Sequence, residues 1–415
     1  MTAPAFATGA NDPEPAGARL LLRVSDARGP LGALVLDDVV AQRACGGLRI
    51  AAAVTEEELR ELAAVMTLKF AFFGIACGGA KAGLVVPANA TPEERQRRIR
   101  TFGAALGPLI RAGTYIPGTD LGCGERDLWE VVAGAGLPVG VPPGTGPVET
   151  SGTAAFSGRS AAIAAIAALG GGIEGATLAV LGYGRVGAAL AGRFAAAGGR
   201  LVGVSTARGA AVHPVGFDVA RLERLRARQG DDAPLDYPGA HAVDPHELLA
   251  LGADVIAPCA TVGMIDGTLA RRVRCRVVSS GANAALTDDA ETVLGGRGTI
   301  VVPDFVANAG GVLVSHFWPL QLPDSAIDAL LERRFRAIVE DLLSRAARRA
   351  TTPAALARKL ARRNLARLRR DLPYAIRHER MLARLGRSRA YRVLPPVVVG
   401  ALALRIASHL GPPAD

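Results

Sequence analysis

The stretch TLAVLGYGRVG, residues 177–187, decides the fold of this 415-residue chain. Its five leading residues predict a buried strand, and the alanine-rich run after it predicts a helix. In the GxGxxG pattern the first glycine permits a tight turn, the second lets a pyrophosphate approach the backbone, and the third lets the helix pack on the strand. A next strand over residues 200–204 stands at the right distance. Together these features predict a Rossmann domain that binds a dinucleotide.

The rest of the chain also alternates between strands and helices. Downstream of the fingerprint we expect strands over residues 255–257, 276–279 and 300–302, which suit a doubly wound parallel sheet. Upstream we expect a glycine-rich loop at 74–83, strands over 20–24, 32–37 and 84–86, and helices over 55–71 and 91–110. The fold class is therefore α/β, with a domain on each side of the proline- and glycine-rich segment 134–146. We expect domains over 1–140 and 141–320, followed by an arginine-rich helical segment over 321–415.

Composition narrows the class of protein. Half of the residues are hydrophobic and 21% are charged, as in globular proteins. We see no signal peptide and no apolar run long enough to span a membrane. The five cysteines are scattered, and the histidines are scattered too, so we expect no disulfide framework and no metal site. These features predict a soluble cytoplasmic protein.

The net charge of +10 is unevenly distributed. The excess of arginine is concentrated between Arg333 and Arg392, in the segment expected to be helical. Such composition is typical of a solvated helix face. We therefore expect neither nucleic acid nor a membrane surface as a partner.

Lysine is the most informative residue type. Only three of the 48 basic residues are lysines, namely Lys69, Lys81 and Lys359. Arginine stays protonated in proteins, whereas a lysine amine can lose its proton when it is buried or placed beside another cation. Two lysines retained twelve residues apart in an apolar, glycine-rich stretch therefore indicate positions where arginine cannot serve. Chance retention in a packed segment is the alternative.

The end of the second Rossmann strand bears on the cofactor. An acidic residue about 20 residues after the fingerprint usually binds the ribose hydroxyls of NAD. This chain has Thr206 and then Arg208 there, and no carboxylate. We therefore expect NADP to be tolerated or preferred, unless Arg208 is only a solvated turn residue.

Besides the fingerprint, seven short motifs resemble those of one protein family. They are GGLR at 46–49, MTLK at 66–69, GGAKAG at 78–83, YIPGTDLG at 115–122, SGRS at 157–160, SGAN at 280–283 and PDFVANAGGV at 303–312. With the fingerprint, their order and spacing resemble the glutamate/leucine/phenylalanine/valine dehydrogenases over residues 20 to 320. The resemblance implies reversible oxidative deamination of an amino acid to a 2-oxo acid and ammonia with NAD or NADP. It also implies a homo-oligomer, a catalytic first domain, and C-terminal helices that pack back on that domain.

The resemblance assigns roles residue by residue. Lys69 would hold the substrate α-carboxylate, Lys81 would be the general base, and Asp120 would handle the proton on the substrate nitrogen. The substrate set is Lys69, Gly47, Cys45, Gly118, Val312 and Ser315. The cofactor set is Ser157, Gly182, Tyr183, Gly184, Arg185, Val186, Gly187, Thr206, Arg208, Ala260, Asn283 and Asn308.

The departures from the family pattern concern the substrate. Cys45 stands where glutamate-specific members carry a lysine for the distal carboxylate, although Ser315 matches the glutamate branch. We expect a neutral side chain of the leucine, valine or phenylalanine kind, with glutamate as the alternative if an arginine such as Arg49 replaces the missing lysine. Two other classes stay open: a different Rossmann oxidoreductase, against which the trio of Lys69, Lys81 and Asp120 argues, and a non-catalytic dinucleotide-binding regulator.

Overall fold

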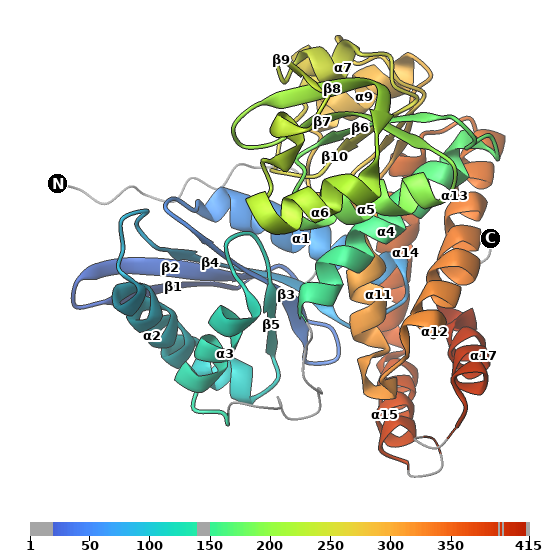
Figure 1. The fold of residues 1–415 in the computed structure, drawn as a ribbon. Coiled ribbons are helices and arrows are strands. Elements are labelled where there is room, and N and C mark those ends of the chain that lie inside the picture. The colour runs from blue at the N-terminus through green and yellow to red at the C-terminus, as the bar shows by residue number, and fades with distance from the viewer. Residues whose placement is uncertain (1–19, 139–149, 389–390, 392–393, 412–415) are drawn as a thin grey trace.

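A computed structural model describes residues 20–138, 150–388, 391 and 394–411 of the chain. It contains two β-sheets, each covered by helices, and a C-terminal group of helices (Figure 1). The predicted α/β class with two sheet-bearing parts is confirmed. The expected linker lies mostly within 139–149, outside the described residues.

The first sheet mixes antiparallel and parallel strands in the order β1-β2-β4-β3-β5. The strands are β1 (Leu20–Asp26), β2 (Gly29–Leu36), β3 (Ala44–Ala51), β4 (Gly78–Val85) and β5 (Tyr115–Thr119). Helices α2 (Pro92–Arg111) and α3 (Glu125–Gly134) pack against one face, and α1 (Glu56–Phe72) packs against the other (Figure 1). The Thr55 hydroxyl accepts a hydrogen bond from the Glu58 amide at 3.2 Å and begins α1 as expected.

The glycine-rich stretch before residue 84 is not the loop that we expected. Residues 78–85 form β4, in the centre of the sheet. A Cβ on Gly79 would lie only 2.2 Å from the Ala63 carbonyl oxygen of α1. The glycines there allow a helix to approach the strand backbone closely, so a pattern typical of loops belongs here to a buried strand.

The second sheet has the order β12-β11-β10-β6-β7-β8-β9. Strands β12 (Ile300–Val302), β11 (Val277–Ser279), β10 (Val255–Pro258), β6 (Thr177–Leu181) and β7 (Arg200–Ser205) are parallel, as predicted for a doubly wound fold. Strands β8 (Ala210–Phe217) and β9 (His241–Val243) add an antiparallel edge that we did not expect. The helices of this part are α4 (Thr150–Leu169), α5 (Arg185–Ala196), α6 (Val219–Gln229), α7 (Glu247–Ala250), α8 (Gly267–Ala270), α9 (Asp288–Gly296), α10 (Asp304–Ala307) and α11 (Gly310–His316).

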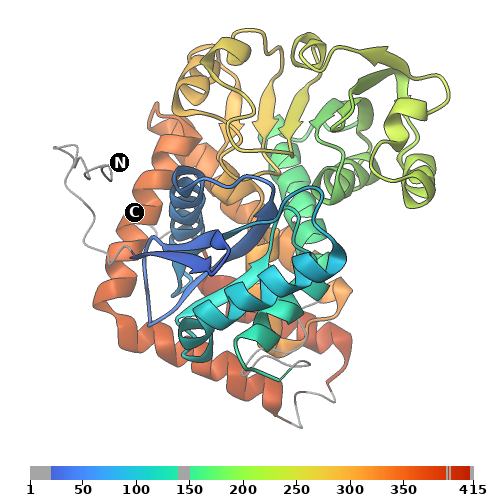
Figure 2. The ribbon, with the colours of Figure 1, turned by 90° about the vertical axis from the view of Figure 1, so that its left-hand side faces the viewer.

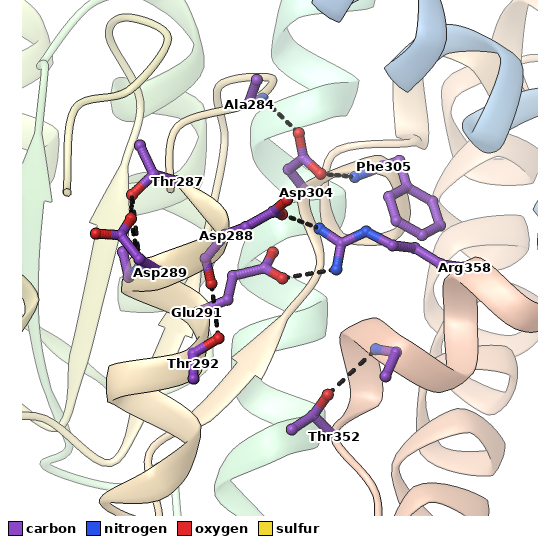
Figure 3. A network of polar contacts seen from close by, with 12 residues as sticks. Ala284, Thr287, Asp288, Asp289, Glu291, Thr292, Asp304, Phe305, Thr352 and Arg358 are labelled. Atoms are coloured by element: carbon purple, nitrogen blue, oxygen red, sulfur yellow. Dashed lines mark hydrogen bonds and ion pairs between the residues drawn. The ribbon is translucent and has the colours of Figure 1, made fainter. Parts of the chain in front are cut away.

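The C-terminal helices run along one side of the first domain and below it (Figure 2). They are α12 (Asp324–Ala329), a π-helical turn (Leu330–Phe335), α13 (Arg336–Arg348), α14 (Pro353–Arg370), α15 (Leu372–Arg387) and α17 (Pro396–Ile406). Helix α14 makes polar contacts with both sheet-bearing parts. Its Arg358 contacts Glu291 of α9 at 2.7 Å and Asp288 at 3.4 Å (Figure 3), while the amide of Asn364 donates to the Ala71 carbonyl of α1 at 2.9 Å.

Within the described residues, no helix is long and apolar enough to cross a membrane. The same residues contain no group of three or more histidine, cysteine, aspartate or glutamate side chains placed to hold a metal ion. All five cysteines are free thiols.

Candidate active site

Alternation along β3 and β4 separates a core face from the face that carries Lys81, which we call the cleft face because the proposed substrate would bind there. The side chains of Ala44, Leu48 and Ala82 belong to the core beneath α2. Residues of odd number on these strands lie on the opposite face, which α1 partly covers. Lys81 is one of these residues, and only 2% of it is exposed.

Lys81 is the end of a buried chain of charges. Its Nζ lies 2.8 Å from Oδ1 of Asp120, which directly follows β5. The second oxygen of Asp120, Oδ2, accepts from Nε of Arg49 at 2.9 Å. Arg49 in turn is paired with Glu58 of α1. Two cations and two carboxylates from four separate segments therefore neutralise one another on the cleft face.

This network controls the protonation of Asp120. Burial by itself would raise the pKa of its carboxyl group. The positive charges of Lys81 and Arg49, and their hydrogen bonds, outweigh burial and lower that pKa to about 2. Asp120 is therefore ionised near neutral pH.

Lys69 lies in the last turn of α1 and reaches the second domain. Its Nζ donates to Oδ1 of Asn308 at 2.5 Å and to Oδ1 of Asn283 at 2.9 Å. Burial lowers the pKa of Lys69 to about 8, with Lys81 adding repulsion and Asp304 opposing the change. Lys69 therefore joins the two sides of the cleft through neutral acceptors.

The other residues predicted to bind the substrate come from both domains. Gly47 of β3 stands beside Gly118 of β5, and a Cβ on Gly47 would lie 2.9 Å from Cβ of Asp120. Cys45 is partly buried against the apolar core that includes Met66 and Phe70 of α1. Burial raises the pKa of its thiol to about 11, although Arg43 opposes the shift. Val312 and Ser315 come from α11, on the opposite domain.

The fingerprint has the backbone geometry that a dinucleotide needs. Gly182 has a φ of +102°, and a Cβ there would come within 2.7 Å of Cβ of Ala260. A Cβ on Gly187 would lie 2.3 Å from the Gly182 carbonyl oxygen, so the start of α5 can pack on β6 only with glycine there. At Gly184 the nearest atom is a side-chain oxygen of Asp231, 3.9 Å away, so the backbone is open to a phosphate group. These residues fit a bound NAD(P).

The remaining cofactor residues fall into three places. Arg185, Val186 and the buried Tyr183 belong to the fingerprint, and the Tyr183 hydroxyl donates to Glu223 at 2.9 Å, so only the Tyr183 backbone is available to the cofactor. Ser157 lies on α4, where a Cβ on Gly311 would meet its hydroxyl at 2.8 Å. Thr206 and Arg208 form the turn after β7, and Arg208 extends toward Asp232 at 4.0 Å.

The sequence did not indicate that Arg49 and Glu58 belong to the site. From the sequence alone, Arg49 is only a possible substitute for the missing lysine, and Glu58 is only part of the helix cap. The pairing register could have suggested the contact, because Leu48 stands opposite Thr119 and the next residues are Arg49 and Asp120. That register follows from the folded sheet and is not visible in the sequence.

Comparison with known proteins shows the family to which the chain belongs. Two protein-family models match the sequence. The one for the dimerisation domain of Glu/Leu/Phe/Val dehydrogenases matches residues 37–133. The one for Glutamate/Leucine/Phenylalanine/Valine dehydrogenase matches residues 146–371. Glutamate dehydrogenase of Thermotoga maritima is 32% identical over 338 residues, which cover 74% of this chain and 79% of that protein. NADP-specific glutamate dehydrogenase A1 of Halobacterium salinarum is 35% identical over 286 residues, covering 66% and 68%.

The solved structures give the same result. The hetero-hexameric glutamate dehydrogenase from Thermus thermophilus, in its Leu-bound form, superposes with a TM-score of 0.71. The sequence identity is 30%, and the match covers 85% of this chain and 88% of that one. The chain therefore belongs to the Glu/Leu/Phe/Val dehydrogenase family and is an NAD(P)-dependent amino-acid dehydrogenase.

Proposed function

We propose that the protein catalyses the reversible oxidative deamination of L-glutamate to 2-oxoglutarate and ammonia. The buried pair of Lys81 and Asp120, 2.8 Å apart beside Lys69, carries the proposal for the reaction. The choice of glutamate is supported by the relatives named above, which are all glutamate dehydrogenases. They favour the alternative that the sequence left open over the neutral substrate that we expected.

Each side chain of the trio has a chemical task in this proposal. Lys69 binds the α-carboxylate, which makes a stronger charge-assisted hydrogen bond than the amide oxygens of Asn283 and Asn308 that it now contacts. Asp120 is ionised and can take a proton from the substrate nitrogen. Lys81 acts as the base that activates water for attack on the iminium carbon.

The bound NAD(P) supplies the hydride acceptor. The amides at the start of α5 would hold its pyrophosphate, and Asn308 with Ser157 would lie near the nicotinamide. Both sides of the cleft are needed, because the proton-transferring groups come from the first domain and the cofactor groups from the second. This division agrees with a catalytic domain over 1–140, a cofactor domain over 141–320 and a C-terminal segment over 321–415.

A neutral amino acid remains the second candidate, and Cys45 favours it. The distal carboxylate of glutamate would enter a cleft where burial already disfavours a charged thiol. Burying that carboxylate without a cation costs several kcal/mol. Arg49 does not supply the cation in this structure, since it is engaged by Asp120 and Glu58.

A substrate panel tests the proposal. Catalytic efficiency is measured for glutamate, leucine, valine and phenylalanine with NAD and with NADP, by the absorbance of the reduced cofactor. Glutamate should lead. If a neutral amino acid leads, glutamate is the wrong substrate and Cys45→Lys should raise activity toward it. No turnover with any amino acid, or with 2-oxo acids and ammonia, would favour the non-catalytic regulator.

Two further features are part of the proposal. The absence of an acid at Thr206 supports use of NADP at least as well as NAD, and an NADP-specific relative is consistent with it. The match to a dimerisation domain, together with a hetero-hexameric relative, supports assembly into an oligomer; that its subunits are identical stays a prediction.

A further inference from the structure

We propose that Arg49 is a positioning residue for Asp120, held in place by Glu58, and that it supplies the constant positive charge of the site. The inference rests on the proposed catalytic roles of Asp120 and Lys81. It assigns a task to two charged side chains that the reaction scheme above does not use.

The geometry gives the two carboxylate oxygens of Asp120 different partners. Oδ1 faces Lys81 at 2.8 Å, and Oδ2 faces Arg49 at 2.9 Å. A carboxylate held at one oxygen can rotate about its last bond, whereas one held at both oxygens keeps a single orientation. Arg49 therefore fixes Asp120 with Oδ1 toward the base.

The fold explains how these groups meet. Strand β3 lies between β4 and β5, so Lys81 and Asp120 contact each other across it. At the crossing point β3 carries Gly47, where a Cβ would lie 2.6 Å from the Thr119 carbonyl oxygen. Two residues further along the same face comes Arg49, only 7% exposed. The sequence GGLR thus places Gly47, which has no side chain, and the cation Arg49 beside Asp120.

The positive charge of Arg49 matters because Lys81 changes charge during the proposed reaction. When Lys81 has given up its proton, it no longer attracts the carboxylate of Asp120. An arginine keeps its charge at any pH at which proteins are folded. Arg49 therefore keeps Asp120 ionised through the part of the cycle in which Lys81 is neutral.

Glu58 completes the arrangement from the other side. It pairs with Arg49 and belongs to the first turn of α1, the helix whose last turn carries Lys69. The pairing leaves the four charged groups neutral in sum, which lowers the cost of burying them. It also sets the direction of the guanidinium.

The test compares Arg49→Gln, Arg49→Lys and Glu58→Gln with the wild type. The control is Arg60→Gln, which changes an exposed arginine on α1, the helix that also carries Glu58. Arg49→Gln should lower kcat by about 10- to 100-fold, the usual effect of losing a charged hydrogen bond, while KM for the amino acid changes by less than about threefold. Arg49→Lys should have a kcat close to that of the wild type. Glu58→Gln should lower kcat by about threefold, and the control variant should have the kcat of the wild type.

The pH profile separates positioning from a structural role. The pKa of Asp120 is held low partly by Arg49, so without Arg49 it should rise, and the acid limb of kcat should move to higher pH. Arg49→Lys should return the limb toward its original place. An unmoved limb in Arg49→Gln, or a higher KM at unchanged kcat, would overturn the proposal and make Arg49 a substrate-binding residue.

Infrared titration reads the same effect without catalysis. The carboxylate band of Asp120 is isolated as the difference between each protein and its Asp120→Asn variant, with folding checked by circular dichroism. The band should titrate at higher pH in Arg49→Gln than in the wild type, and equal titration contradicts the proposal. If the wild type shows no turnover with any amino acid, the proposed function fails while the infrared result still decides the role of Arg49.

Discussion

The two sides of the cleft differ in chemical character. The first domain contributes Lys81, Asp120 and Arg49, which form a buried network of full charges. The second domain contributes Asn283, Asn308 and a glycine-rich turn, which have hydrogen-bonding groups and no charge. In the proposed reaction, the groups that gain or lose protons therefore lie in the first domain, and the groups that would hold the cofactor lie in the second.

Lys69 shows what this separation achieves. It is a cation of the first domain, yet its ammonium donates to neutral amide oxygens of the second domain, those of Asn283 and Asn308. Neutral acceptors satisfy the ammonium without cancelling its charge. In the proposed reaction this positive charge is available to the substrate carboxylate, whereas a carboxylate partner at the same place would cancel it.

The largest effect is expected from Lys81→Arg, which keeps the positive charge at this position but replaces an amine that can lose its proton with a guanidinium that cannot. Turnover should fall by about 10²- to 10⁴-fold or more, the usual contribution of a general base. Cofactor binding, measured by fluorescence of the reduced dinucleotide, should persist because the fingerprint lies in the other domain. Turnover near that of the wild type would remove Lys81 from the mechanism.

Asn308→Asp places a charge on the neutral side. The ammonium of Lys69 is present below its pKa of about 8 and is lost as the pH rises through that value, so kcat/KM for the amino acid should decline above it. A neighbouring carboxylate favours the charged lysine and raises its pKa, so the decline should move to higher pH. At pH 7 the same carboxylate should compete with the substrate and raise KM by about tenfold. Asn283→Asp should move the profile in the same direction, and an unshifted profile in both variants would separate Lys69 from substrate binding.

Thr206→Asp adds a charge where the cofactor ribose is expected. A carboxylate there binds ribose hydroxyls and repels a 2′-phosphate, so the preference should move toward NAD by about tenfold in kcat/KM. Both cofactors are measured in wild type and variant under saturating amino acid. A wild type that already depends strictly on NAD would show that another residue, such as Asp232 beside Arg208, sets the choice.

The smallest effect is expected from Arg358→Gln on α14, away from the cleft. Its ion pair with Glu291 is partly buried, so the free energy of unfolding should fall by about 1 kcal/mol in denaturant titrations. Arg362→Gln, at an exposed position of the same helix, is the control and should change little. Equal effects of the two substitutions would mean that the contact in Figure 3 does not help to join α14 to the second domain.

Local patterns predicted the parts of the fold that depend on neighbouring residues. The strand before the fingerprint and the capped start of α1 were predicted, because apolar periodicity and a threonine cap act within a few residues. Of strand β4 only the end was predicted, as a strand over 84–86; its glycine-rich part was taken for a loop, because those glycines are explained only by the helix packed on them. The edge strands β8 and β9 also depend on pairing across the sheet.

The candidate site divides in the same way. Lys69 and Lys81 were singled out from composition alone, because lysine is rare in this chain and chemically distinct from arginine. The contact of Arg49 with Asp120, 71 residues apart, was not predicted. It depends on the register of β3 against β5, which no short motif records.

The scarcity of lysine also affects how the protein can be labelled. Of its three side-chain amines, Lys69 and Lys81 are almost fully buried, whereas Lys359 is exposed on α14. An amine-directed reagent should therefore attach a dye or a surface linker to one side chain of the folded protein, on the helix that contacts both domains. Modification of the two buried amines would then report transient opening of the cleft.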